Sequence, residues 1–198
     1  CLGVGNYTER DIQETARCFT GWEVRQGRFR FNRFLHDAGV KSIFGETGRF
    51  DGDDAVRIVL AQPAAARWIA RRLIREFVCD EEVPDELVEP LAERLRDSGF
   101  QIRPVVRQIL TSRYFYAEEN LGNKVRSPID LAVGLLRSLQ GSVSTHVLAE
   151  ALRPLGQRLF YPPSVKGWDG GLQGINATKM IGRVNLVATI LHHKTARF

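Results

Sequence analysis

Apolar residues recur at helical spacing from the start of the chain. In residues 9–19, Ile12 and Ala16 lie four positions apart within a mostly polar segment. Thr8 precedes this segment and can cap its first turn, while Asp11, three residues later, can return a hydrogen bond to the Thr8 backbone. This pattern predicts a first helix over about residues 9–19.

The same spacing predicts helices through the remainder of the chain. Ser127 followed by Pro128 is a strong start signal, a capping side chain before a proline at the first helical position. Gly99 and Gly141 follow apolar periodic segments and can end them. The further predicted helices cover about residues 53–62, 64–78, 85–98, 101–114, 128–140, 145–155 and 178–191.

One segment alternates with a period of two instead. Phe29 and Phe31 are interleaved with arginines, which is typical of a half-buried strand. Residues 40–44 could form a partner strand, with the sequence HDAG as the connection. We therefore predict a single β-hairpin over about residues 24–45.

The predicted fold class is mainly α, an irregular helical bundle of about seven short helices with one small β-hairpin. We expect a single domain over residues 1–198, with the hairpin at about 24–45 and the helical region at about 53–194. No apolar run approaches the roughly 20 residues of a spanning helix, so no membrane span is expected in this fragment.

Composition adds little about chemistry. The chain has 43% hydrophobic and 26% charged residues, which is typical of a globular protein. The net charge of +5 weakly favours anionic partners, but the basic residues are interspersed with acids and do not indicate a dedicated nucleic-acid groove. Cys1, Cys18 and Cys79 lack the spacing of a zinc site; we expect buried thiols, and a disulfide between any two stays open. No metal or cofactor is predicted.

The densest polar cluster is HDAGVK, which contains His36, Asp37 and Lys41. A histidine beside a carboxylate is a plausible acid/base pair or pair of metal ligands, yet nearby residues supply no further ligands. The structural alternative has Asp37 capping its own turn, Gly39 at a positive φ and His36 bonded to a carbonyl of the hairpin. Residue chemistry alone favours this structural role.

Two aromatic positions are candidate ligand contacts. Trp68 lies on the arginine-rich side of its predicted helix and could be a platform for a sugar or a base, or be covered by a neighbouring helix. Trp168 and Asp169 belong to the loop KGWDGG, whose composition is typical of a carbohydrate-contacting loop, although the ring could equally anchor the loop to the core. The segment GVGNYT at residues 3–8 lacks the third glycine of a phosphate loop, so a turn and cap are expected there.

The chain as a whole resembles a known family. The segments that carry the resemblance are, in order, YTERDIQETARCFTGW, HDAGVKSIFG, QPAAARWIARRLIREFV, LTSRYFY, KVRSPIDLAVGLLRSL and LGQRLFYPPSVKGWDGG, with Arg183 and Asn185 in the last helix. Over about residues 2–190, this ordered set resembles the C-terminal half of a bacterial family catalogued as domain of unknown function eighteen-hundred. The positions that match the family pattern include His36, Asp37, Lys41, Trp22, Gly45, Gly167 and Trp168.

The resemblance implies a cellular location and partners, and it implies no reaction. Members of that family are longer than this chain, mainly helical and often exported. They are frequently encoded beside a secreted protein of the alkaline phosphatase and sulfatase superfamily, and some carry carbohydrate-binding modules. By resemblance we expect an exported location, periplasmic or at the cell surface, and such a protein as a partner.

Three functional hypotheses follow. The leading one is an accessory or binding domain of an exported bacterial envelope protein that recognises polysaccharide or a partner enzyme, through the hairpin turn and the KGWDGG loop. The alternative is a hydrolase on an anionic or sugar substrate, with His36 as general base oriented by Asp37, and Lys41 or Arg183 stabilising negative charge. A third is nucleic-acid binding through the arginine face of residues 67–75.

Overall fold

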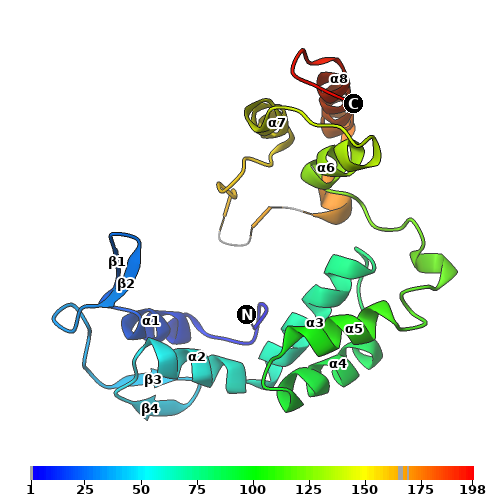
Figure 1. Ribbon diagram of the computed structural model, residues 1–198. Helices are drawn as coiled ribbons and strands as arrows, with labels where there is room; N and C mark the ends of the chain where they lie inside the picture. Colours follow the sequence, from blue (N-terminus) through cyan, green and yellow to red (C-terminus); the bar gives the residue numbers. More distant parts are fainter. Residues whose placement is uncertain (1, 165–166, 169) are drawn as a thin grey trace. The chain divides into compact units, whose positions relative to one another are not determined.

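The computed structural model describes residues 2–164, 167–168 and 170–198. The described residues form eight α-helices and two small antiparallel sheets, so the prediction of a mainly α fold is confirmed. The chain divides into two compact units (Figure 1). Unit 1 contains the chain up to Phe77 together with Glu82–Phe115, and unit 2 contains Val78–Glu81 and Tyr116–Phe198. The expectation of a single domain stays a prediction, since compact units of one chain can belong to one domain.

Unit 1 holds all four strands and five of the helices. Its elements are α1 (Glu9–Cys18), β1 (Trp22–Arg25), β2 (Arg28–Phe31), β3 (Lys41–Ile43), β4 (Glu46–Gly48), α2 (Gly52–Ala61), α3 (Pro63–Phe77), α4 (Asp85–Asp97) and α5 (Ile102–Leu110). Unit 2 contains α6 (Pro128–Ser138), α7 (Thr145–Leu152) and α8 (Ala177–His192), with short 3-10 turns at Glu118–Asn120, Arg153–Leu155 and Gly171–Gly174. None of the described helices is long and apolar enough to cross a membrane.

The helix starts follow the capping signals of the sequence. The Thr8 hydroxyl accepts a hydrogen bond from the Asp11 N–H over 3.2 Å, and the Asp11 carboxylate accepts one from the Thr8 N–H over 2.9 Å. Ser127 and Asp130 form the same reciprocal pair at the start of α6, with Pro128 as the first helical residue. These caps satisfy amides that have no partner inside the helix, which explains why the predicted starts are accurate.

The predicted strand pairing is wrong. Residues 28–31 pair with β1 rather than with residues 41–43, and β3 pairs with β4, so the described residues contain two hairpins where one was predicted. Each hairpin closes through two residues that end in glycine, Gln26–Gly27 and Phe44–Gly45, all at positive φ. Such tight turns match the twist of antiparallel strands and join immediate neighbours, whereas the HDAG pairing would need a longer connection.

The expected burial of the first hairpin is also wrong. Phe29 is 63% exposed and Phe31 is 46% exposed, although their alternation with arginine predicted a half-buried strand. The alternation does separate the two faces of the hairpin, because side chains on a strand point alternately to opposite sides. No buried core cluster includes these phenylalanines among the described residues.

The edge of β3 is bonded by side chains of α1. The Ser42 N–H donates to the Glu14 carboxylate over 2.9 Å. The Phe44 N–H donates to the Asp11 carboxylate over 2.9 Å. We call this pair of bonds the α1–β3 clasp. The clasp supplies acceptors for amide groups at the edge of β3, a strand of three residues whose strand neighbour is β4. The Ser42 N–H is also the main cause that holds the pKa of Glu14 below its usual value.

Behind the α1–β3 clasp lies a small apolar core. Its fully buried members are Cys18, Ile43, Ala55 and Ile58, with phenylalanines packed around them. Burial raises the pKa of the Cys18 thiol, so it is a small hydrophobe rather than a reactive group. Cys79 is also buried and is not bonded to Cys18, and Cys1 lies outside the described residues.

Each remaining core is built from amphipathic helices. In unit 1, α3, α4 and α5 pack on one another and bury small and branched residues, namely Ala66, Ala70, Ile74, Val88, Leu91, Ala92, Leu95, Val105 and Ile109. In unit 2, α6, α7 and α8 bury Ala132, Leu152, Leu155, Leu186 and Ile190. The many alanines of α3 bring its neighbours close, because they fill little volume at the contact.

We expect substitutions at Gly52 and Gly134 to change stability in opposite directions. A Cβ at Gly52 would lie 2.4 Å from a ring carbon of Trp22, so Gly52→Ala displaces the ring and lowers the free energy of unfolding by about 1–3 kcal/mol. Gly134 is a matched helical glycine whose Cβ would meet only an Arg126 guanidinium nitrogen at 3.5 Å. Gly134→Ala should therefore raise stability by about 0.5–1 kcal/mol. Urea unfolding of both variants checks this, and a stabilised Gly52→Ala protein would contradict the close packing.

Candidate functional site

His36 lies in the connection between β2 and β3 and is half-buried. Its Nδ1 donates to the Thr20 carbonyl over 2.9 Å, and its ring lies 5.3 Å from the ring of Phe31 between centroids. His36 was predicted to bond a carbonyl of the hairpin; the carbonyl that it bonds is that of Thr20, which follows α1 and precedes the predicted hairpin, so this part of the structural alternative is wrong. With a proton on Nδ1, the basic nitrogen of the neutral ring is Nε2.

Asp37 is held by Arg17 of α1. Its carboxylate accepts from Arg17 Nε over 2.7 Å and from Nη2 over 3.2 Å, and from the Gly39 N–H over 2.8 Å. The Arg17 guanidinium, and then the Gly39 amide, lower the pKa of Asp37 from 3.8 to about 2. These bonds leave Asp37 an anion that fixes its own turn, as the structural alternative predicted, and they do not orient the imidazole of His36.

Gly39 is needed for space and not for its backbone angle. It does not adopt a positive φ, so that part of the structural alternative is wrong. A Cβ at this position would lie 2.9 Å from both Arg17 Nη2 and Asp37 Oδ1. The absence of a side chain therefore lets the ion pair of Arg17 and Asp37 lie directly on the backbone.

Lys41 is the only charged or polar residue in the buried class among the described residues, with 1% of its surface exposed. Its ammonium group donates to three backbone carbonyls, those of Asp37, Phe50 at 2.8 Å and Gly39 at 3.3 Å. All three ammonium protons thus have acceptors inside the fold. The cation ties the turn to the segment after β4, and this arrangement gives it a structural role.

The other candidates lie in unit 2. Arg183 of α8 donates through Nη1 to the Arg126 carbonyl over 2.7 Å, while its buried Nε has no hydrogen-bond partner among the described residues. Trp168 is 39% exposed, and Asp169 lies outside the described residues. The convergence of Arg183 with His36 and Asp37 stays a prediction, because those two residues belong to unit 1.

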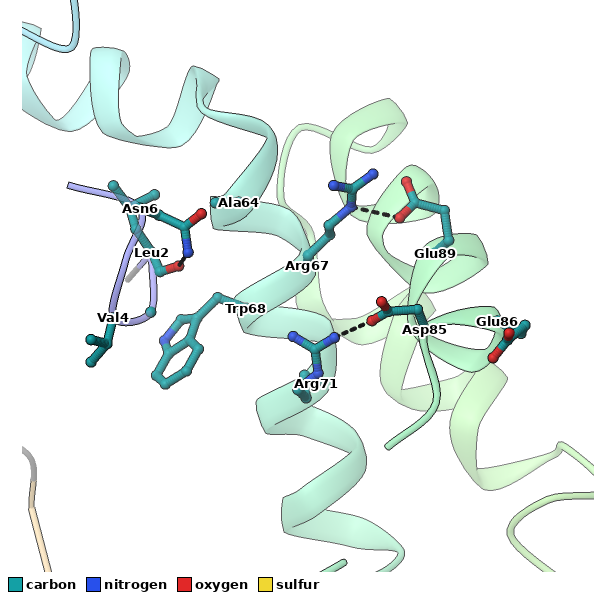
Figure 2. Close-up of a pocket in the computed structure, with 11 residues that line it drawn as sticks. Leu2, Val4, Asn6, Ala64, Arg67, Trp68, Arg71, Asp85, Glu86 and Glu89 are labelled. Atoms are coloured by element: carbon teal, nitrogen blue, oxygen red, sulfur yellow. Dashed lines mark hydrogen bonds and ion pairs between the residues drawn. The ribbon is translucent and has the colours of Figure 1, made fainter. Parts of the chain in front are cut away.

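Trp68 lines an open groove on unit 1 (Figure 2). The groove has a volume of about 650 Å³, within the range of small-ligand sites. It lies between the loop before α1 and the facing sides of α3 and α4. The lining residues are Leu2, Gly3, Val4, Asn6, Ala64, Arg67, Trp68, Arg71, Asp85, Glu86 and Glu89.

Matched charges cross the groove from α3 to α4. Arg67 Nε lies 2.7 Å from a Glu89 oxygen, and Arg71 forms an ion pair with Asp85. Arg67 and Arg71 are four residues apart on one face of α3, and Asp85 and Glu89 have the same spacing on α4. Because α3 and α4 run antiparallel here, each arginine meets one carboxylate. The pKa of Glu89 is lowered by Arg67 first and by Arg96 second, so this carboxylate is held as an anion.

The Trp68 ring is supported on one side and open on another. A Cβ at Gly3 would lie 3.1 Å from a ring carbon, so the backbone of the loop before α1 is packed against the indole. The Arg72 guanidinium lies 6.0 Å from the ring centroid. Figure 2 shows the ring between this loop and α3, beside the charged rows. The indole is therefore a held platform next to paired hydrogen-bonding groups.

Sequence reasoning found part of this groove. It singled out Trp68 and the arginines of α3, but it treated Asp85 only as a helix start and residues 3–8 as a turn. The signal that would have found the opposite wall is the shared spacing of four residues in Arg67/Arg71 and Asp85/Glu89. Among the described residues, no group of three or more His, Cys, Asp or Glu side chains could hold a metal ion.

We expect Lys41→Met to destabilise the protein. Methionine fills a similar volume but leaves the partly buried carbonyls of Asp37, Gly39 and Phe50 without their donor, so the free energy of unfolding should fall by about 2–4 kcal/mol. Lys194→Met is the matched control on an exposed residue and should change stability by less than about 0.5 kcal/mol. Urea unfolding measures both. An unchanged value for Lys41→Met would mean that this cation does not support the turn.

The stability contributed by Asp37 should depend on pH. Its folded pKa of about 2 lies below the ordinary 3.8, so its contribution is complete above pH 3.8 and is lost as the pH falls toward 2. We expect Asp37→Asn to lower the urea midpoint at neutral pH, and the gap from the parent protein to close between pH 3.8 and 2. Asp97→Asn, at the exposed end of α4, should show no such closing gap. A constant gap for Asp37→Asn across this range would contradict the assignment.

Comparison with known proteins places the chain in a family. No curated protein and no solved structure matches it. The family described as "Protein of unknown function (DUF1800)" matches residues 1–197, which is nearly the whole chain. The resemblance seen in the sequence is therefore confirmed, and the chain belongs to the family described as "Protein of unknown function (DUF1800)".

Proposed function

We propose that this chain is a binding domain of an exported bacterial envelope protein and that it recognises a neutral polysaccharide in the groove beside Trp68. The observation that carries the proposal is the juxtaposition of an indole platform with two rows of fixed charged groups. An indole face packs against the C–H face of a sugar ring, and carboxylates and guanidinium groups bond its hydroxyls. The exported location and the secreted partner belong to this proposal through the family resemblance.

The charge balance of the groove favours a neutral ligand. Arg67 and Arg71 are both paired with carboxylates of α4, and Glu86 adds a further negative charge. No surplus positive charge is therefore available for a polyanion. This pairing also argues against nucleic-acid binding through the arginine face of α3, since a phosphate backbone requires unpaired cations.

The hydrolase alternative has less support from the geometry. Its proposed base, His36, has no oriented carboxylate beside it, because the Asp37 carboxylate is bonded to Arg17 and Gly39. Its proposed cation, Lys41, donates all its hydrogen bonds to backbone carbonyls of the fold. The pKa of Glu89 in the groove is lowered, chiefly by Arg67, so this carboxylate is not a general acid. Binding is the simpler use of these residues.

We expect Trp68→Ala to weaken polysaccharide binding by at least roughly fivefold, since loss of a stacked aromatic removes about 1–3 kcal/mol. Calorimetric titration with soluble neutral glucans and mannans measures this. Because Trp68 also supports the loop before α1, Glu86→Gln provides a second variant: Glu86 is exposed in the groove, and its loss should weaken binding severalfold without changing the unfolding midpoint.

Trp168→Ala is the matched control for Trp68→Ala, because it removes an exposed indole in unit 2. Full binding by this variant supports the groove as the site. A loss confined to Trp168→Ala would move the site to the KGWDGG loop. No heat change with any neutral glycan would contradict the proposal, and release of reducing sugar that depends on His36 would favour the hydrolase.

A further inference from the structure

The hairpin of β1 and β2, residues 22–31, has two faces of opposite character; we call it the ribbon. Its register places Trp22 opposite Phe31 and Val24 opposite Phe29, so these four apolar side chains share one face. The alternate positions pair Arg25 with Arg28 and Glu23 with Arg30, and they share the other face.

The apolar face is anchored at its base and exposed toward its tip. Trp22 makes edge-to-face contacts with Phe19 and Phe29, with centroids 5.0 and 5.1 Å apart. Toward the tip, Val24 is 79% exposed and Phe29 is 63% exposed. The segment after the ribbon adds Phe34, which is 84% exposed. Val24 and Phe29 lie opposite each other in the register, and an exposed apolar pair of this kind is typical of an interaction surface.

The basic face carries unpaired charge. Arg25, Arg28 and Arg30 are exposed and form no ion pair with any described residue, whereas Arg67 and Arg71 of α3 are both paired. A hollow of about 570 Å³ at the tip is lined by the three ribbon arginines together with Gln26 and Phe29. Arg25 and Arg28 lie directly opposite each other, a like-charge pair that destabilises a hairpin unless an anion lies between the two groups.

We propose that the ribbon binds the surface of an anionic lipid bilayer. Phe29 and Val24 enter the boundary between head groups and acyl chains, and the arginines of the opposite face reach lipid phosphates with their long side chains. Charge complementarity identifies the occupant: the surplus cations of the ribbon match the negative potential of anionic lipids. This surface is separate in the sequence from the groove of the proposed function, which involves α3, α4 and the loop before α1.

The separation of the two faces favours a bilayer over other partners. A single nucleic-acid strand needs stacking rings and cations along one groove, but the register directs rings and guanidinium groups to opposite sides. A protein partner that covers the apolar face would leave the arginines unused. A lipid interface can contact the apolar face and the arginines together, because it accommodates apolar and charged groups at different depths.

The test is co-sedimentation of the whole chain with vesicles of phosphatidylcholine alone, or of phosphatidylcholine and phosphatidylglycerol in equal parts. We expect binding to the anionic vesicles and little to the neutral ones, with a steep decrease at high salt. Phe29→Ser should lower the partition coefficient roughly tenfold, and Arg25→Gln with Arg28→Gln should lower it at least roughly tenfold at low salt. Thermal unfolding checks that these exposed substitutions leave the fold intact.

Two matched controls sit outside the ribbon. Phe160→Ser removes an aromatic ring that is 84% exposed in unit 2, and Arg103→Gln with Arg137→Gln removes two exposed charges from helices. Both control proteins should sediment like the parent. Equal losses in the control and ribbon variants would overturn the assignment, because a general charge or hydrophobic effect would then explain the binding.

Other outcomes also overturn the proposal. If the parent chain does not sediment with anionic vesicles at low salt, the proposal is wrong. A single-stranded oligonucleotide that binds with the same dependence on Phe29 and the two arginines would identify nucleic acid as the occupant. A concentration-dependent dimer that Phe29→Ser abolishes, without vesicle binding, would identify a second copy of the chain.

Discussion

The α1–β3 clasp is the interaction on which the architecture of the first part of unit 1 depends. A strand of three residues with one strand neighbour is marginal by itself, because half of its backbone groups need other partners. Side chains of α1 supply them, with Glu14 bonded to Ser42 and Asp11 bonded to Phe44. Asp11 also closes the capping box of α1, so one carboxylate fixes both the start of the helix and the edge of the strand.

The position of β3 determines the roles of the HDAGVK residues. Once the strand is fixed, Ile43 enters the apolar core and Lys41 points inward beside it on the same face. A buried ammonium group is costly unless each proton has an acceptor; the turn provides the carbonyls of Asp37 and Gly39, and the segment after β4 provides that of Phe50. Arg17, one turn after Glu14, then binds Asp37 and closes the turn on α1. The HDAGVK residues, whose composition is that of an active site, therefore stabilise the turn.

Local features of the fold could be predicted from the sequence, and long-range ones could not. Helix starts depend on neighbours three residues apart, such as Ser127 and Asp130, which a sequence displays directly. The pairing of strands depended on the geometry of Gln26–Gly27, a two-residue turn that sequence analysis overlooked. The bond of Glu14 to Ser42 joins positions 28 residues apart, and no periodicity of the sequence reveals that this carboxylate meets this backbone donor.

The ribbon differs from α3 and α4 of unit 1 in how its charged side chains are paired. On α3 and α4, arginines and carboxylates are arranged so that each guanidinium of the groove has a partner. On the ribbon, Arg25 lies opposite Arg28, and Val24 and Phe29 are exposed to solvent. Local rules of stability are broken there on both faces at once. Proteins tolerate such departures where a surface serves something other than folding, because the cost is recovered when a complementary partner covers it. The groove with its paired charges and the ribbon with its exposed arginines are therefore two surfaces of different chemical character on one small unit.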